Sequence, residues 1–256
     1  TVNRQVTALL DAGVLRERAD LAVSGAIGRP RVPVEVNHEP FLTLGIHIGA
    51  RTSIIVATDL FGRTLDVVET PTPRGSQNSA LAALAGSASR YLSRWHRRRP
   101  LWVGVTAGGV VDSATGHVDH ARLGWTDAPV GPVLAETLGL PVSLASHVDA
   151  MAGAELLLGT RRVNGSAASN AASNTAPVTS LYVYARETVG YALSIGGRVH
   201  SPTSGPGTIA ALPAQSEMLG GSGQLESTVS DEAVLTAARR LRIVPADGPS
   251  STIGAV

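Results

Sequence analysis

Two histidines are the residues of this sequence whose surroundings most suggest chemistry. His47 lies between two glycines in residues 44–51, and His147 follows Ser146 and comes shortly before Asp149. An imidazole titrates close to neutral pH, so either side chain could act as a general base. The pair could also share a transition metal, but the sequence offers no evident third ligand. We therefore expect no metal site and no bound cofactor.

The composition excludes several other kinds of chemistry. All 21 basic residues are arginine, so no lysine is present to form a Schiff base or to hold a phosphate as an ammonium group. Cysteine is absent, which excludes disulfides and thiolate metal sites and fits a cytoplasmic protein. The net charge of +1 means that any contact with nucleic acid must be local. No segment is apolar for long enough to cross a membrane, and the first residues are not those of a signal peptide.

The first segment predicts a helix with one apolar face. Residues 1–12 have the spacing of an amphipathic helix, and Gly13 is the expected stop. The apolar positions are Val2, Val6, Leu9 and Leu10, and Asn3, Arg4 and Thr7 project elsewhere. Short strands over residues 14–18 and 32–36 enclose a basic, glycine-containing loop over residues 24–31. This order is typical of the second half of a winged helix-turn-helix, so we expect the first half to precede Thr1.

The next segment, residues 41–160, predicts a layered α/β domain. Three strands linked by short turns are followed by helices that alternate with strands. We expect the long helix to bury Leu81, Leu84, Tyr91, Leu92 and Trp95 and to end before Pro100. Its basic end, residues 94–99, is interpreted as cations placed favourably at a helix C-terminus. The expected strands cover residues 42–47, 53–58, 64–70, 101–105 and 142–145, and the expected helices cover residues 78–98, 131–138 and 150–158.

The last part of the chain predicts a second, smaller α/β lobe. Residues 163–179 are small and polar and are interpreted as a flexible insertion. The predicted strands cover residues 181–186, 191–195 and 198–200, and a helix is expected over residues 231–241.

In order and spacing, several of these segments resemble the ROK family (repressors, open reading frames, kinases), and in particular its winged-helix transcriptional regulators. The resemblance is found in residues 1–4, 28–30, 45–49, 111–116, 123–125, 139–142 and 223–226. It implies an α/β, actin-like (ribonuclease-H-like), two-lobed sugar-kinase-type body preceded by part of a winged helix-turn-helix. The implied division is residues 1–40 for the DNA-binding part, 41–160 for the first lobe, 161–180 for the insertion and 181–256 for an incomplete second lobe.

Several residues that the resemblance assigns to catalysis are replaced in this chain. The family kinases hold magnesium with an Asp at the position of His47, and an imidazole is a poor ligand for that ion. Their second phosphate turn is glycine-rich, whereas this chain has residues 186–190, in which Glu187 would repel phosphate. Their catalytic base is an Asp at the position of His147, while Asp149 falls where a helix N-cap is expected. The family's four zinc ligands have no counterparts here.

The resemblance also implies where this chain binds its partners. Operator DNA would be contacted by Thr1, Asn3, Arg4, Gln5 and Thr7 of the helix and by Arg29 and Arg31 of the wing. A sugar-like effector would contact Arg122, Ser146, His147 and Glu226. The family forms dimers or tetramers, so a homodimer or homotetramer is expected.

We therefore predict a bacterial transcriptional regulator, repressor-like, with a catalytically inactive kinase-type body. Two alternatives remain open from the sequence. One is a divergent ATP-dependent sugar kinase in which His147 serves as the base. The other is a ligand-independent scaffold whose cleft no longer binds anything.

Overall fold

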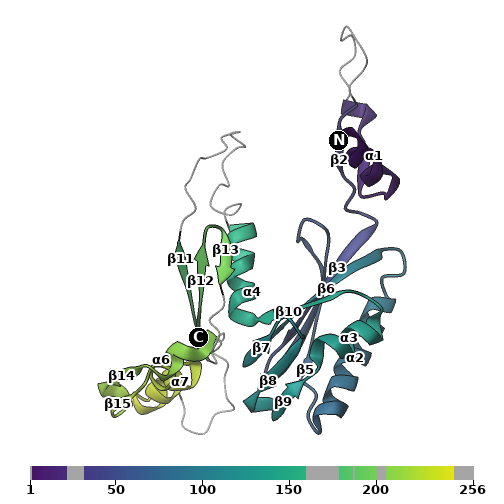
Figure 1. Cartoon of the computed structure of the whole chain (residues 1–256). Coiled ribbons are helices and arrows are strands. Elements are labelled where there is room, and N and C mark those ends of the chain that lie inside the picture. The colour runs from purple at the N-terminus through teal and green to yellow at the C-terminus, as the bar shows by residue number, and fades with distance from the viewer. Residues whose placement is uncertain (1, 22–31, 160–178, 187, 201–205, 245–256) are drawn as a thin grey trace. The chain divides into compact units, whose positions relative to one another are not determined.

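The computed structural model describes residues 2–21, 32–159, 179–186, 188–200 and 206–244 (Figure 1). The chain forms two compact units, Thr1–Val105 with Pro129–Ser143, and Thr106–Ala128 with Leu144–Val256. Each unit combines segments that are separate in the sequence, and two of the unit boundaries fall inside strands, at residues 105–106 and 143–144. The four segments predicted from the sequence therefore remain a prediction, and the insertion over residues 161–180 lies mostly outside the described residues.

The N-terminal segment is a helix followed by a two-stranded antiparallel sheet, as predicted. Helix α1 (Val2–Asp11) ends at Gly13, whose φ of 72° is the left-handed conformation that glycine adopts without strain. Strand β1 (Leu15–Glu17) pairs with β2 (Val34–Val36), so that Leu15 lies opposite Val36. A single turn of 3-10 helix, η1 (Ala19–Leu21), follows β1.

A five-stranded sheet is the main layer of the body. Its order is β10 (Val142–Ser146), β6 (Arg99–Ala107), β3 (Phe41–Ile48), β4 (Thr52–Thr58), β5 (Thr64–Pro71). The last three form the antiparallel meander that alternating apolar residues predicted. Alternate residues of β3 are buried, among them Leu42, Leu44, Ile46 and Ile48, so one face of this strand belongs to the core.

Two helices pack together along this sheet (Figure 1). They are α2 (Gln77–Ser93), which buries Leu81, Leu84 and Tyr91, and α3 (Val130–Leu138), which buries Val130 and Leu134. The predicted end of α2 at residue 98 was wrong, because the helix stops at Ser93. The Arg94 and Trp95 amides bond three residues back, to Tyr91 and Leu92, and close the helix with tight turns. Pro100 does not stop a helix, since it already belongs to β6.

A separate antiparallel sheet of three strands was not predicted from the sequence. It consists of β7 (Val110–Asp112), β8 (His117–His120) and β9 (Trp125–Ala128), with a 3-10 turn η2 (Ala121–Leu123) between the last two. Its strands are three or four residues long, too short to show a clear alternation in the sequence. This sheet places Arg122 at the turn that leads into Trp125.

The second unit also contains a helix packed on a small sheet. The sheet order is β11 (Ser180–Ala185), β12 (Val189–Ile195), β13 (Arg198–His200), and α4 (His147–Ala154) packs on it through Val148 and Ala152. Helix α4 begins three residues earlier than predicted and continues as a π-helix over Glu155–Gly159. The segment after β13 contains η4 (Pro206–Ala211), the hairpin β14 (Pro213–Ser216) and β15 (Gly221–Gln224) with η5 (Glu217–Leu219) between them, then α6 (Leu225–Val229) and α7 (Asp231–Arg240).

The burial of β6 yields a direct test of this core. Val103 of β6 is fully buried, whereas Val67 of β5 is 51% exposed. Val103→Ala is expected to lower the free energy of unfolding by about 2 kcal/mol, because two buried methyl groups are removed and a cavity remains. Val67→Ala, the matched control, should change it by less than about 0.5 kcal/mol. Urea denaturation monitored by tryptophan fluorescence measures both, and equal effects of the two substitutions would contradict the assigned core.

Candidate functional site

The four described DNA-binding candidates of α1 are all exposed. Asn3, Arg4, Gln5 and Thr7 have accessible side chains, and the Thr7 hydroxyl donates to the Asn3 carbonyl at 3.0 Å. None of these side chains is engaged in the packing of the segment, so each remains accessible to a partner. The other three candidates, Thr1, Arg29 and Arg31, lie outside the described residues.

The hairpin that supports the predicted wing is held together by charged side chains. Glu35 of β2 accepts hydrogen bonds from Arg16 Nε and Arg18 Nη1, both at 2.6 Å, across the two-stranded sheet. Arg18 also donates to Asp20. The Arg16 hydrogen bond holds the pKa of Glu35 below its ordinary value, and the Asp20 and Glu35 hydrogen bonds raise the pKa of Arg18. These contacts hold β1, η1 and β2 together.

Residues 37–41, called the joint below, tie this segment to the body. The Asn37 amide donates to the Val14 carbonyl at 2.8 Å, and its side chain donates to the Gly13 carbonyl at 3.0 Å. The next residue, His38, places Nδ1 3.1 Å from Oδ2 of the buried Asp59. Asn37 is thus hydrogen-bonded to the N-terminal segment, while the adjacent His38 lies beside a buried carboxylate of the body.

The loop after α2 completes the joint. Arg98 Nη1 donates to the Phe41 carbonyl at 3.2 Å and to the His38 carbonyl at 3.5 Å. The Arg99 amide donates to the Pro40 carbonyl at 2.7 Å. The joint is therefore held from both sides by hydrogen bonds to backbone carbonyls.

His47 lies at the first turn that the sequence matched to a phosphate site. The turn between β3 and β4 is closed by its own hydrogen bonds: the Gly49 amide donates to Thr52, and the Gly49 carbonyl accepts from the Thr72 hydroxyl at 2.7 Å. A Cβ at Gly49 would lie 2.6 Å from the Thr52 carbonyl oxygen and 3.4 Å from His47 Nε2. Only glycine fits this position, and the half-buried imidazole packs directly beside it.

His147 is the first residue of α4 rather than part of a loop before it. The N-cap is Ser146, whose Oγ accepts from the Asp149 amide at 3.1 Å and donates to its carboxylate at 2.6 Å. The prediction that Asp149 is the N-cap was wrong, since Asp149 lies inside the first turn, where its amide and its carboxylate both bond to the Ser146 hydroxyl. The His147 ring packs edge-on against Tyr184 of β11, with centroids 4.7 Å apart.

The second turn matched to a phosphate site interacts with acidic side chains of the same unit. The Val189 amide donates to Glu226 Oε2 at 3.4 Å. The Arg186 carbonyl accepts from the Asp231 amide at 2.8 Å, and its Nε lies 3.5 Å from the Asp231 carboxylate. The Glu226 carboxylate thus accepts a hydrogen bond from a backbone N–H that a bound phosphate would otherwise accept. Glu187 lies outside the described residues.

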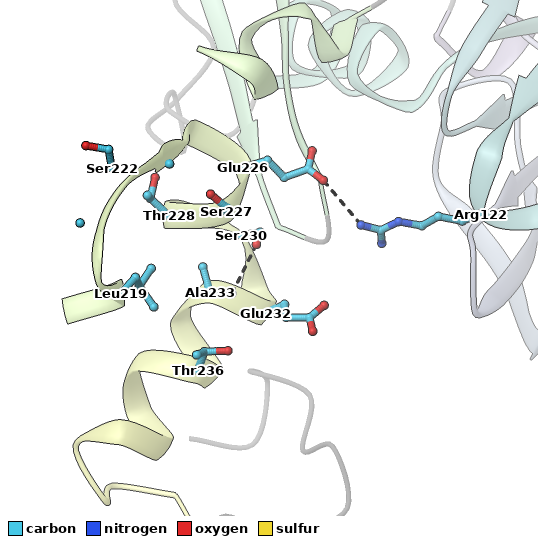
Figure 2. A pocket seen from close by; sticks show the side chains of 12 residues that line it. Arg122, Leu219, Ser222, Glu226, Ser227, Thr228, Ser230, Glu232, Ala233 and Thr236 are labelled. Atoms are coloured by element: carbon cyan, nitrogen blue, oxygen red, sulfur yellow. Dashed lines mark hydrogen bonds and ion pairs between the residues drawn. The ribbon is translucent and has the colours of Figure 1, made fainter. Parts of the chain in front are cut away.

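A pocket of about 400 Å³ lies where Arg122 faces α6 and α7 (Figure 2). Arg122 Nη2 is 3.7 Å from Glu226 Oε1, so the structure brings these two predicted ligand residues together. The other two predicted ligand residues, Ser146 and His147, do not line this pocket. Its lining also contains polar side chains that sequence reasoning missed, namely Ser222, Ser227, Thr228, Glu232 and Thr236.

The polar lining of this pocket depends on two capped helices. In α6, Gln224 and Ser227 satisfy each other's backbone groups, and in α7 the Ser230 hydroxyl accepts from the Ala233 amide at 3.4 Å. The lining offers an arginine, two carboxylates and several hydroxyls, which could bind a polyhydroxylated ligand. The volume of about 400 Å³ limits such a ligand to a few rings.

The residues that the structure describes contain no group of three or more His, Cys, Asp or Glu side chains arranged to hold a metal ion. They also contain no helix that is long and apolar enough to span a membrane.

The antiparallel meander with its helices and the second α/β unit define an actin-like, sugar-kinase-type fold. A ROK family transcriptional regulator, described as a homologue of the E. coli MLC protein, superposes with a TM-score of 0.74 at 22% identity over 98% of this chain and 63% of its own. A ROK hexokinase from Thermus thermophilus superposes with a TM-score of 0.56 at 25% identity, over 79% of this chain and 65% of its own.

This chain belongs to the ROK family, whose sequence profile matches residues 43–205. It is 78% identical over 245 residues to proteins described as transcriptional regulators in Mycobacterium tuberculosis (strain ATCC 25618 / H37Rv) and Mycobacterium bovis. The match covers 96% of this chain and 54% of each relative. The chain therefore spans about half the length of these relatives.

The cap of α4 generates a test at the position where the family kinases have their catalytic base. Ser146→Ala removes both side-chain hydrogen bonds to Asp149 and should lower the free energy of unfolding by about 1 kcal/mol. Amide hydrogen exchange at Asp149 should accelerate in parallel. Ser113→Ala, in an exposed turn of the same unit, is the control and should change neither quantity. If Ser146→Ala behaves like this control, Ser146 is not the N-cap.

Proposed function

We propose that this chain belongs to a DNA-binding, repressor-like transcriptional regulator whose actin-like body binds a small effector and does not transfer phosphate. The observation that carries the proposal is α1, an amphipathic helix that exposes Asn3, Arg4 and Gln5 to solvent. It precedes a pair of strands held together by charged side chains. Asn, Gln and Arg are the side chains that pair with base edges in the major groove. The mycobacterial relatives described as transcriptional regulators support the same conclusion.

The body supports binding rather than catalysis. His47 and His147 stand where the ROK kinases have acidic residues, and neither offers the oxygen ligand that Mg²⁺ prefers. At the second turn, the Val189 amide donates to Glu226, which disfavours an approaching phosphate by its charge. This combination favours a regulator over the alternative of a divergent sugar kinase.

The pocket beside Arg122 is the proposed effector site, with a sugar-like ligand held by Arg122 and Glu226. A ligand changes DNA binding only if it binds two conformations of the protein with different affinity. The joint is the proposed connection between the body and the DNA-binding segment. The regulator is proposed to act in the cytoplasm as a homodimer or homotetramer, because a two-fold dimer matches paired operator half-sites.

The recognition helix is tested by substitution in the full-length protein. Asn3→Ala with Arg4→Ala should weaken binding to genomic fragments recovered by the wild type by about tenfold or more, because each bidentate base contact contributes about 1–3 kcal/mol. The same residue types changed on the body, Asn78→Ala with Arg74→Ala, form the matched control. Gel-shift titrations measure both affinities. Equal affinity of the two double variants would remove α1 from the DNA interface.

A panel of hexoses and amino sugars separates the regulator from the kinase. With MgATP present, ATP consumption should stay at background for every sugar, because both phosphate turns lack kinase residues. A sugar that occupies the proposed pocket should raise the melting temperature of the wild type, and Glu226→Gln should weaken this shift.

Glu155→Gln, which alters an exposed acidic residue of the same unit outside the pocket lining, is the control for Glu226→Gln. Sugar-dependent ATP turnover by the wild type would establish the kinase alternative. A melting temperature that no ligand changes would instead favour the ligand-independent scaffold.

A further inference from the structure

A basic surface follows α2 and has no role in the proposed recognition of bases. It consists of residues 94–99, called the basic turn, in which Arg94, His96, Arg97 and Arg99 are exposed. The sequence suggested that these charges stabilise a helix C-terminus. Because α2 ends at Ser93 and the influence of a helix dipole falls off within the last turn, Arg97 and Arg99 are not explained in that way.

The charges of the basic turn are only partly neutralised. Arg94 lies 3.5 Å from Asp66 and stacks over Tyr91, with its guanidinium carbon 5.5 Å from the ring centroid. Within the described parts of the chain, no acidic side chain lies within ion-pair distance of Arg97 or Arg99. Two arginines therefore remain exposed and available to an anionic partner.

The basic turn is bonded directly to the joint. Arg98 donates to the His38 and Phe41 carbonyls, and the Arg99 amide donates to the Pro40 carbonyl. The residue before His38, Asn37, bonds to Gly13 and Val14, immediately after α1. Arg97 and Arg99 thus flank a residue that is hydrogen-bonded to the joint, and the joint follows directly on the segment that carries the recognition helix.

We propose that Arg97 and Arg99 bind phosphates of duplex DNA beside the bases contacted by α1, so that the body of the protein extends the DNA footprint. This inference rests on the proposed function. Guanidinium groups suit phosphate oxygens because they present several donors in a planar fork, and phosphate contacts fix the orientation of a protein on DNA without reading its sequence. The joint then connects two DNA-binding surfaces.

Salt dependence of binding measures how many phosphates the protein binds. Full-length protein is titrated against duplex DNA of unrelated sequence over a series of salt concentrations, with fluorescence anisotropy as the readout. Arg97→Ala with Arg99→Ala should reduce the magnitude of the slope of log K against log salt by about 0.9 for each phosphate that is no longer bound. Arg97→Lys with Arg99→Lys retains the charges and should restore the slope.

Arg51→Ala with Arg74→Ala is the matched control, since it removes two exposed arginines elsewhere in the first unit. It should leave the slope as in the wild type. The inference is overturned if the Arg97/Arg99 alanine variant keeps the wild-type slope, or if the control lowers it equally. A wild type that binds no DNA would instead refute the proposed function. Melting curves verify folding, and Arg97→Gln alone tests the removal of one charge should the double variant be unstable.

Discussion

The hydrogen bonds of the joint are the constraint on which the rest of this structure depends. Asn37 is bonded to the N-terminal segment, and the adjacent His38 is bonded to the body through Arg98 and lies beside the buried Asp59. A flexible linker would let the two parts move independently. Here hydrogen bonds from Asn37 to the N-terminal segment and from Arg98 to His38 and Phe41 connect both parts to one short stretch of backbone. In a regulator, this is the property that would allow an event in the body to affect DNA binding.

The body keeps the layers of a sugar kinase while its polar turns are satisfied internally. The turn at Gly49 is closed by Thr52 and Thr72, and the turn after β11 is bonded to Glu226 and Asp231. A backbone amide that already donates to a carboxylate is a poor site for another anion. The backbone groups of these two turns are therefore engaged by the protein itself.

Regular alternation and clear stops made much of the fold predictable. The ends of strands β3, β4 and β5 were expected within one residue, because these are runs rich in apolar and β-branched residues that turn residues separate, and Gly13 marked the end of α1. The end of α2 was missed because arginine is a good helix former, and the turn there depends on bonds between Arg98 and a distant segment. Tertiary contacts overrode local preference at that point.

The sequence suggested two residues of the pocket but neither the rest of its lining nor which predicted residues lie together. Arg122 and Glu226 were expected to bind a ligand and do share a pocket, whereas Ser146 serves as a helix cap and His147 packs on Tyr184. The hydroxyl groups of the pocket come from β15, α6, α7 and the Ser230 cap before α7, and the short helix α6 showed no periodic apolar pattern. Which side chains meet is decided by the packing of these short elements.

Footprinting of the full-length protein on genomic fragments that it retains tests the central claim most directly. The account predicts two protected half-sites with two-fold symmetry, spaced by about one helical turn of DNA, roughly 34–36 Å, or a multiple of it. Protection should disappear when Asn3 and Arg4 are changed to alanine. Retention of no fragment, or uniform protection without half-sites, would contradict the assignment of this chain to a sequence-specific DNA-binding regulator.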